Sequence, residues 1–137
     1  MRLELDEALC RDFPNTFRDR HGKPEETSMC WGFPGDGWEP IIRRAAEKIE
    51  AAILKLPAKK QKSVTSAQVK EKFGVLRWYM TPKSKAVDAA IGAAIHEAGR
   101  ESAVTCETCG APGTTKGTKG WYLTLCVRCR RRKRAAR

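Results

Sequence analysis

The sequence reads Cys106-Glu107-Thr108-Cys109 and, after a gap of sixteen residues, Cys126-Val127-Arg128-Cys129. In a four-cysteine zinc site, each Cys-x-x-Cys pair forms a tight turn and both of its thiolates bind the same metal. Gly110 and Gly113 follow the first pair, and glycine adopts the positive φ angles that such turns use. The spacing therefore predicts a structural Zn²⁺ bound by Cys106, Cys109, Cys126 and Cys129. Two disulfides or four unrelated core cysteines are the alternatives.

The chain around these cysteines has 137 residues, 41% of them hydrophobic, which predicts one modest core with a small appended module. We expect a body over residues 1–103, a zinc ribbon over 104–130 and a basic tail over 131–137. No segment approaches the roughly 20 apolar residues that span a bilayer, and the N-terminus is acidic where a signal peptide is apolar. These features predict a cytoplasmic protein without a membrane partner, in which the cysteines stay reduced and bind metal.

Positive charge is concentrated at the C-terminal end. The net charge is +11, whereas the first 127 residues hold 20 of the 27 Lys and Arg residues and all 16 acidic residues, a net charge of +4. A zinc ion with four thiolates lowers the total to about +9, which still attracts an anionic partner such as DNA or RNA. The cations that we assign to this contact are Arg128, Arg130, Arg131, Arg132, Lys133 and Arg134.

Residues 30–38 form a loop in which Trp31, Phe33 and Trp38 stand among three glycines and a proline. The glycines and the proline account for the loop but not for its aromatic residues. Two interpretations stay open: the three side chains cap the core beside the next helix, or they form a contact surface for a nucleobase or a protein partner.

A helix is predicted to begin near Asp36 and Pro40 and to end before Pro57, because the apolar positions between them fall on one side of a helical wheel. A basic linker over 58–63 follows. Residues 64–72 and 75–80 have the composition of two strands, which predicts a hairpin that turns at 72–74. Lys70, Lys72, Arg77 and Trp78 are its candidates for phosphate contact and base stacking, and a solvated sheet face is the alternative.

A second helix is expected to start at Thr81 and Pro82 and to run to about residue 99. One side of this helix carries small side chains and few charges, which permits close approach of another element or a partner chain. Residues 114–120 are expected to form a flexible basic tip, and 121–125 a strand. The apolar side of the helix carries Val87, Ala90, Ile91, Ala94, Ile95 and Ala98, and the small side Ala86, Ala89, Gly92 and Ala93.

The N-terminal thirty residues are less regular. Leu5, Leu9, Phe13 and Phe17 predict one side of a short helix that Pro14 ends. Cys10, His21 and Cys30 lack the close pairing and the fourth ligand of a second metal site, so we interpret the two cysteines as small core residues.

These segments together resemble an uncharacterised family of small zinc-ribbon proteins encoded by phages and prophages. The resemblance covers about residues 30–129. It implies a bacterial cytoplasm and an origin on a mobile element, but it brings no reaction with it. It rests on Gly35-Asp36-Gly37-Trp38 with Ile41-Ile42, on Gln68-Val69-Lys70-Glu71-Lys72-Phe73-Gly74 running into Leu76-Arg77-Trp78-Tyr79, and on Cys106 to Gly113 with Trp121, Thr124, Cys126 and Cys129.

Catalysis is not expected. Four cysteines fill the coordination sphere of a zinc ion, whereas a hydrolytic zinc keeps one position open. His21 and His96 are the only histidines, and neither lies beside a cysteine pair. The chain has no deaminase motif, no nucleophile elbow and no phosphate-binding glycine loop.

We therefore expect an α+β fold of two main helices and a small antiparallel hairpin, followed by a four-cysteine zinc ribbon. The leading functional hypothesis is a non-enzymatic protein that binds host nucleic-acid-associated machinery and modulates it, such as an anti-CRISPR or anti-restriction inhibitor. Its partner is then a host protein or nucleoprotein complex. The alternative is a regulatory protein that binds DNA or RNA directly through the arginine-rich end and the ribbon.

Overall fold

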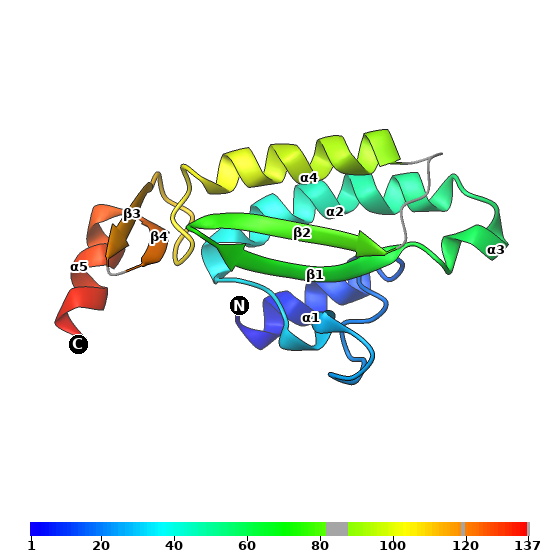
Figure 1. Cartoon of the computed structure of the whole chain (residues 1–137), viewed down its shortest axis with the longest axis horizontal. Coiled ribbons are helices and arrows are strands. Elements are labelled where there is room, and N and C mark those ends of the chain that lie inside the picture. The colour runs from blue at the N-terminus through cyan, green and yellow to red at the C-terminus, as the bar shows by residue number, and fades with distance from the viewer. Residues whose placement is uncertain (82–87, 119, 137) are drawn as a thin grey trace.

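The computed structural model describes residues 1–81, 88–118 and 120–136. It has the expected α+β architecture, with helices, two small antiparallel two-stranded sheets and the four cysteines next to the second sheet (Figure 1). The helices are α1 (Leu3–Asp12), α2 (Glu39–Leu54), α3 (Ala58–Gln61), α4 (Asp88–Ser102) and α5 (Val127–Ala135), with short 3₁₀ turns η1 (Ser28–Trp31) and η2 (Asp36–Trp38). The strands are β1 (Thr65–Lys72), β2 (Val75–Thr81), β3 (Thr114–Thr118) and β4 (Trp121–Leu125).

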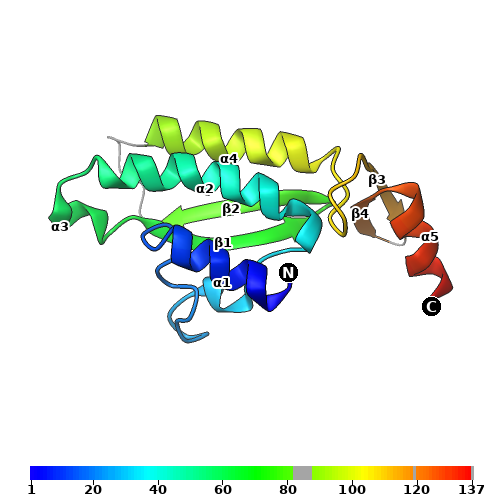
Figure 2. The ribbon, with the colours of Figure 1, turned by 180° about the vertical axis from the view of Figure 1, so that it is seen from behind.

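The main core lies between α2 and the β1–β2 hairpin, with α4 packed on both α2 and β2 (Figures 1 and 2). Helix α2 confirms the predicted apolar side, because all of its predicted core positions are buried. Pro40 lies in the first turn, where a missing N–H costs no helical hydrogen bond. The buried positions are Ile41, Ile42, Ala45, Ala46, Ile49, Ala52, Ile53 and Leu56.

The predicted hairpin is also confirmed. Phe73 and Gly74 form its two-residue turn with φ angles of 56° and 80°, as in a type I′ turn. Lys70 pairs with Arg77, and Val69 pairs with Trp78 on the opposite face of the sheet. The basic residues and Trp78 therefore lie on different faces.

One buried carboxylate holds the N-terminal segment to the body, and a second joins two parts of the segment to each other. Glu50 of α2 accepts hydrogen bonds from the backbone and side chain of Asn15 (3.2 and 2.7 Å) and of Thr16 (2.8 and 2.6 Å). Asp6 of α1 pairs with Arg20 at 2.7 Å. Leu9, Phe13 and Phe17 enter the main core, in agreement with the predicted short helix, and Leu5 is half-buried.

The start of the second helix was predicted wrongly in part. Thr81 is the last residue of β2, where it pairs with Thr65, and it therefore does not cap a helix. Pro82 and Val87 lie outside the described residues. Within α4, Ile91, Ala94 and Ala98 are buried as expected, but Ala90 is exposed. The small side is exposed at Ala89, Gly92 and Ala93.

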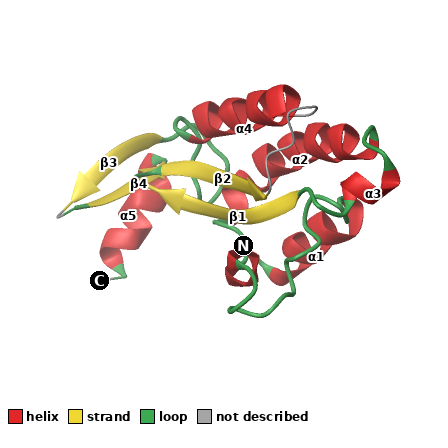
Figure 3. Cartoon of the chain, turned by 45° about the vertical axis from the view of Figure 1, so that its right-hand side comes forward, coloured by secondary structure: helices red, strands yellow, loops and turns green. Residues whose placement is uncertain are grey.

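Two segments that were expected to be irregular have regular structure. The basic linker contains the short helix α3, and the expected flexible tip contains β3, which pairs with β4 from Thr114–Leu125 to Thr118–Trp121. The β3–β4 hairpin lies beyond the turn end of the β1–β2 hairpin (Figure 3). Among the described residues, no helix has the length and apolar character needed to cross a membrane.

Candidate metal centre and basic surface

The four predicted cysteine ligands come together in one cluster. Their Sγ atoms all lie within 4.8 Å of one another, and those of Cys109 and Cys126 are 3.7 Å apart. A tetrahedral site with Zn–S bonds of about 2.3 Å places its sulfurs about 3.8 Å apart. The donor set and its spacing therefore fit a metal ion such as Zn²⁺. Cys106 and Cys129 are buried, Cys126 is half-buried and Cys109 is exposed.

Backbone hydrogen bonds shape the first cysteine turn. The N–H of Gly110 donates to the carbonyl of Cys106 (2.9 Å), and the N–H of Cys106 donates to the carbonyl of Ala111 (2.7 Å). Gly110 has a φ of 76°, which a side chain would strain. The glycine predicted for this turn thus has a defined conformational role.

The second cysteine turn is the start of α5. Cys126 is the N-cap residue, and its Sγ accepts a hydrogen bond from the N–H of Cys129 at 3.4 Å. This bond lowers the pKa of Cys126 to about 7, because it favours the thiolate. Burial raises the pKa of Cys129 to about 12, since an apolar environment disfavours its thiolate. A cation bound between the sulfurs would favour the thiolate form of both.

Residues 35–38 dock onto the first cysteine turn, a contact that the sequence did not reveal. The N–H of Gly37 donates to the carbonyl of Glu107 (2.8 Å), and the indole N–H of Trp38 donates to the carbonyl of Thr105 (2.8 Å). The N–H of Gly35 donates to the carboxylate of Glu107 (3.2 Å), whose pKa is raised by burial. The Gly-Asp-Gly-Trp motif therefore holds the first cysteine turn to the body.

A second contact joins the ribbon to the β1–β2 turn. The hydroxyl of Thr124, which is fully buried, donates to the carbonyl of Gly74 and is hydrogen-bonded to the hydroxyl of Thr115. The backbone of Thr124 in turn accepts from the N–H of Glu107 (3.0 Å). The cysteine turns thus contact the body at two places.

The arginine-rich end is a helix rather than an extended tail. Five of its candidate cations are exposed on α5: Arg128, Arg131, Arg132, Lys133 and Arg134. Arg130 differs from them. Its Nη2 donates to the carbonyls of Thr114 (2.7 Å), Leu123 (3.2 Å) and Leu125 (3.4 Å) and thereby ties α5 to the β3–β4 hairpin. Arg130 therefore has an internal structural role, and its contact with a partner stays a prediction.

The candidate aromatic residues separate into two groups. Trp38 is fully buried, Phe33 is 8% exposed and Trp78 is 5% exposed. These three are therefore core residues, and the prediction that they contact a partner is wrong. Trp78 stacks on Phe17 with ring centroids 5.5 Å apart. Trp31, by contrast, is 75% exposed. The core interpretation of the aromatic loop therefore holds for Phe33 and Trp38 but not for Trp31.

The basic residues of the β1–β2 hairpin lie on its outer face. Lys70 Nζ lies 5.5 Å from the ring centroid of Tyr79, and Lys72 Nζ lies 5.4 Å from that of Phe73. Arg77 is exposed beside them. These cations contact aromatic residues other than the predicted Trp78.

Sequence reasoning did not select a further set of exposed aromatic side chains. Phe73 at the hairpin turn is 60% exposed, and Trp121 and Tyr122 of β4 are 76% and 45% exposed. Phe73 and Tyr122 meet edge to face with centroids 6.1 Å apart. Because side chains alternate along β4, the sequence could have indicated that one of Trp121 and Tyr122 faces solvent. The contact between Tyr122 and Phe73 could not be predicted, because no local pattern links the two segments.

Cys10, His21 and Cys30 do not come together as a second metal site. Among the described residues, the four-cysteine cluster is the one group of metal-ligating side chains that meets the geometry of a site, and it contains neither Cys10, His21 nor Cys30. Burial raises the pKa of Cys10 to about 11, which keeps its thiol protonated at neutral pH.

Comparison with protein-family models, curated proteins and solved structures finds no match to this chain. The resemblance to phage-encoded zinc-ribbon proteins therefore stays a prediction, and the function is argued from the site. The site offers a four-cysteine cluster that could hold a metal ion, a cationic helix that starts at this cluster, and exposed aromatic residues on the adjoining hairpin.

Proposed function

We propose that Cys106, Cys109, Cys126 and Cys129 bind a structural Zn²⁺ and that the protein is a non-catalytic binder of nucleic acid. The contact surface is the exposed side of α5 together with the β3–β4 hairpin. A metal with four thiolate ligands has no position for substrate or water, so its role is to hold the two turns together.

The observation that carries this proposal is the charge of α5. The helix presents Arg128, Arg131, Arg132, Lys133 and Arg134 to solvent and contains no acidic residue. A rigid helix fixes the spacing of these cations, whereas a disordered tail would lose entropy on ordering. Cations in this density bind phosphates and release counterions.

The adjoining hairpin adds a stacking group. A small cavity of about 80 Å³ lies between β3–β4 and α5, and it is lined by Lys116 and Trp121 of the hairpin and by Lys133 and Arg134 of the helix. An exposed tryptophan beside cations stacks on a base while the cations contact the flanking phosphates. This combination favours single-stranded over double-stranded nucleic acid, because bases are free to stack in a single strand.

The test is the salt dependence of binding to a labelled single-stranded 15-mer, measured by fluorescence anisotropy on the zinc-loaded protein. The triple variant Arg131→Gln, Arg132→Gln, Arg134→Gln removes three exposed charges but keeps Arg130. We expect at least a tenfold loss of affinity at 100 mM salt and a decrease of roughly 2 in the slope of log K against log salt.

The matched control is Lys59→Gln, Lys60→Gln, Lys62→Gln. It removes the same charge from exposed lysines at α3, at the opposite end of the molecule from α5 (Figure 1). We expect this control to bind within about threefold of the wild type, because salt screens charges at the far end of the molecule from the contact. Equal losses in both triple variants would show that net charge alone attracts the nucleic acid, and the proposed surface would be wrong.

A protein-directed function is the second candidate: modulation of host nucleic-acid-associated machinery by an anti-defence inhibitor of the anti-CRISPR or anti-restriction type. The resemblance to phage proteins suggests it, and the 75% exposure of Trp31 supports a protein contact, since tryptophan is a frequent interface anchor. Affinity purification from nuclease-treated bacterial lysate, with Trp31→Ala as the control bait, tests this role. It is contradicted if both baits recover the same proteins.

A further inference from the structure

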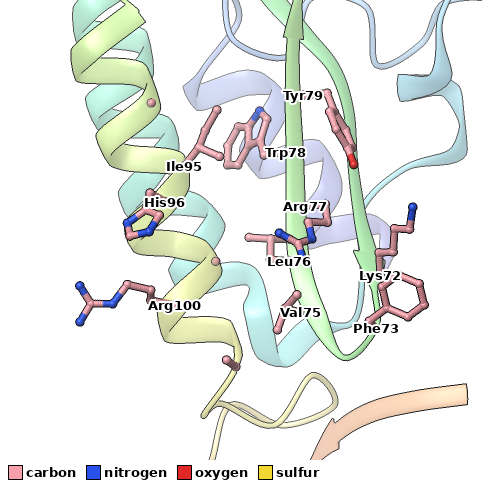
Figure 4. A pocket seen from close by; sticks show the side chains of 13 residues that line it. Lys72, Phe73, Val75, Leu76, Arg77, Trp78, Tyr79, Ile95, His96 and Arg100 are labelled. Atoms are coloured by element: carbon pink, nitrogen blue, oxygen red, sulfur yellow. The ribbon is translucent and has the colours of Figure 1, made fainter. Parts of the chain in front are cut away.

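A long groove separates β2 from α4. Its volume is about 710 Å³, and Figure 4 shows β2 residues from Val75 to Trp78 on one side and Ile95, His96 and Arg100 of α4 on the other. The groove lies in the body of the protein, and no residue of α5 or of the cysteine cluster lines it. Binding in this groove would therefore be independent of the proposed nucleic-acid surface.

One wall of this groove is an unpaired strand edge. Among the described residues, β2 pairs with β1 alone. In an antiparallel pair, alternate residues point their N–H and C=O groups away from the partner strand. Here Lys72–Val75 and Lys70–Arg77 flank the two-residue turn as hydrogen-bonded pairs, so Leu76 and Trp78 point their backbone groups outward. In agreement, the N–H of Leu76 donates to the hydroxyl of Ser102 at the end of α4 (2.9 Å).

The groove is positively charged. Lys72 and Arg77 come from the hairpin and Arg100 from α4, and its lining contains no acidic residue. An occupant with carboxylates would meet opposite charges along both walls.

Two glycines of α4 leave their side of the groove without side chains. Gly92 and Gly99 lie inside α4 and line the groove, although glycine weakens a helix. A Cβ built on Gly92 meets no atom within 4 Å, and one on Gly99 meets only the carbonyl oxygen of Leu76, at 3.5 Å. Packing within this chain does not require a glycine at position 92. The space above it is open.

We propose that this groove binds an extended, acidic segment of a partner protein, which adds as a strand to the edge of β2. The backbone of the segment would pair with the outward N–H and C=O groups of Trp78, beyond Leu76, whose N–H already donates to Ser102. Its acidic side chains would meet Arg77 and Arg100. Nucleic acid shares the negative charge but lacks the alternating donors and acceptors that a strand edge recognises, so the edge favours a peptide.

The test is a selection of random octapeptides displayed on phage, using the zinc-loaded full chain as bait. We expect the enriched peptides to carry Asp or Glu at alternate positions and to slow hydrogen exchange at the amide of Trp78. In Gly92→Leu a side chain fills the groove, and we expect selected peptides to bind this variant at least tenfold more weakly. Ala93→Leu, on the exposed side of α4 outside the groove, is the matched control and should bind as the wild type does.

Thermal melting shows whether Gly92→Leu is folded, and we expect it to melt no lower than the wild type. If it does not fold, the charge reversal Arg100→Glu replaces it and should weaken the same peptides at least tenfold. The proposal is overturned if no peptide is enriched, if selected peptides bind Gly92→Leu as tightly as wild type, or if a dT12 oligonucleotide but no peptide slows exchange at Trp78.

Discussion

The backbone N–H of Gly37 donates a 2.8 Å hydrogen bond to the carbonyl oxygen of Glu107, which lies between the first two cysteines of the metal cluster. The two residues are 70 positions apart in the chain. Their contact, together with the indole bond from Trp38 to Thr105, makes the metal-binding turn part of the main fold rather than a freely attached ribbon. The orientation of α5 relative to the body depends on this contact.

Gly37→Ala should disrupt this docking. A Cβ at position 37 would lie 2.1 Å from the carbonyl oxygen of Cys106, 2.4 Å from the N atom of Gly110 and 2.6 Å from that of Cys109. All three are backbone atoms, so the turn must move away. We expect the free energy of unfolding to fall by about 2–4 kcal/mol in urea denaturation. Gly92→Ala is the control and should instead gain about 0.5–1 kcal/mol, because its site is open. A Gly37→Ala protein as stable as the wild type would show that the contact is dispensable.

Cys126→Ser should release the metal. Three remaining thiolates do not complete a tetrahedral structural site, and the N-cap of α5 loses its sulfur. We expect zinc content to fall from one ion per chain to none, and the amide NMR signals of residues 104–136 to lose their dispersion. Cys30→Ser, outside the cluster, should keep one zinc per chain. Stoichiometric zinc in the Cys126→Ser protein would mean that the four-thiolate assignment is wrong.

Glu50→Gln should destabilise the N-terminal segment. The Glu50 carboxylate accepts four hydrogen bonds from Asn15 and Thr16, whereas an amide turns an NH₂ group toward at least one of these donors. An unsatisfied buried donor costs about 1–3 kcal/mol. We expect a loss of that size in urea denaturation, while Glu47→Gln at an exposed position of the same helix should change stability by less than about 0.5 kcal/mol. Similar losses in both variants would argue against the buried network.

Asp12 should titrate below the ordinary aspartate value of about 3.9. Hydrogen bonds from Arg43 (2.7 Å) and then from Arg11 (3.0 Å) lower its pKa by favouring the carboxylate. Since the folded pKa is below the unfolded one, the contribution to stability is present above about pH 4 and is lost as the pH falls through the folded pKa.

The measurement is the NMR titration of the Asp12 carboxyl carbon. Arg43→Gln should move the midpoint upward toward the ordinary value. Arg44→Gln is the control, since Arg44 pairs with Glu101 instead, and it should leave the Asp12 midpoint in place. A midpoint that Arg43→Gln does not change would contradict the assigned cause.

The features that could be predicted are those that a short stretch of sequence encodes. The two Cys-x-x-Cys pairs, the apolar side of α2 and the hairpin over β1 and β2 depend on spacings of a few residues, which each segment encodes by itself. The four-cysteine cluster and the α+β architecture follow from the sequence. The exact start of α4 does not, because strand pairing of Thr81 with Thr65 overrides the local preference of Thr-Pro for a helix start.

Only the tertiary structure decided which aromatic and cationic side chains are available to a partner. Trp31 and Trp38 belong to one glycine-rich loop, yet one is 75% exposed and the other fully buried, because Trp38 meets Thr105 across 67 positions of the chain. Arg130 stands among five exposed cations but is held by three carbonyls of the β3–β4 hairpin. Such contacts leave no periodic signal, since burial there depends on distant segments that only the folded chain brings together.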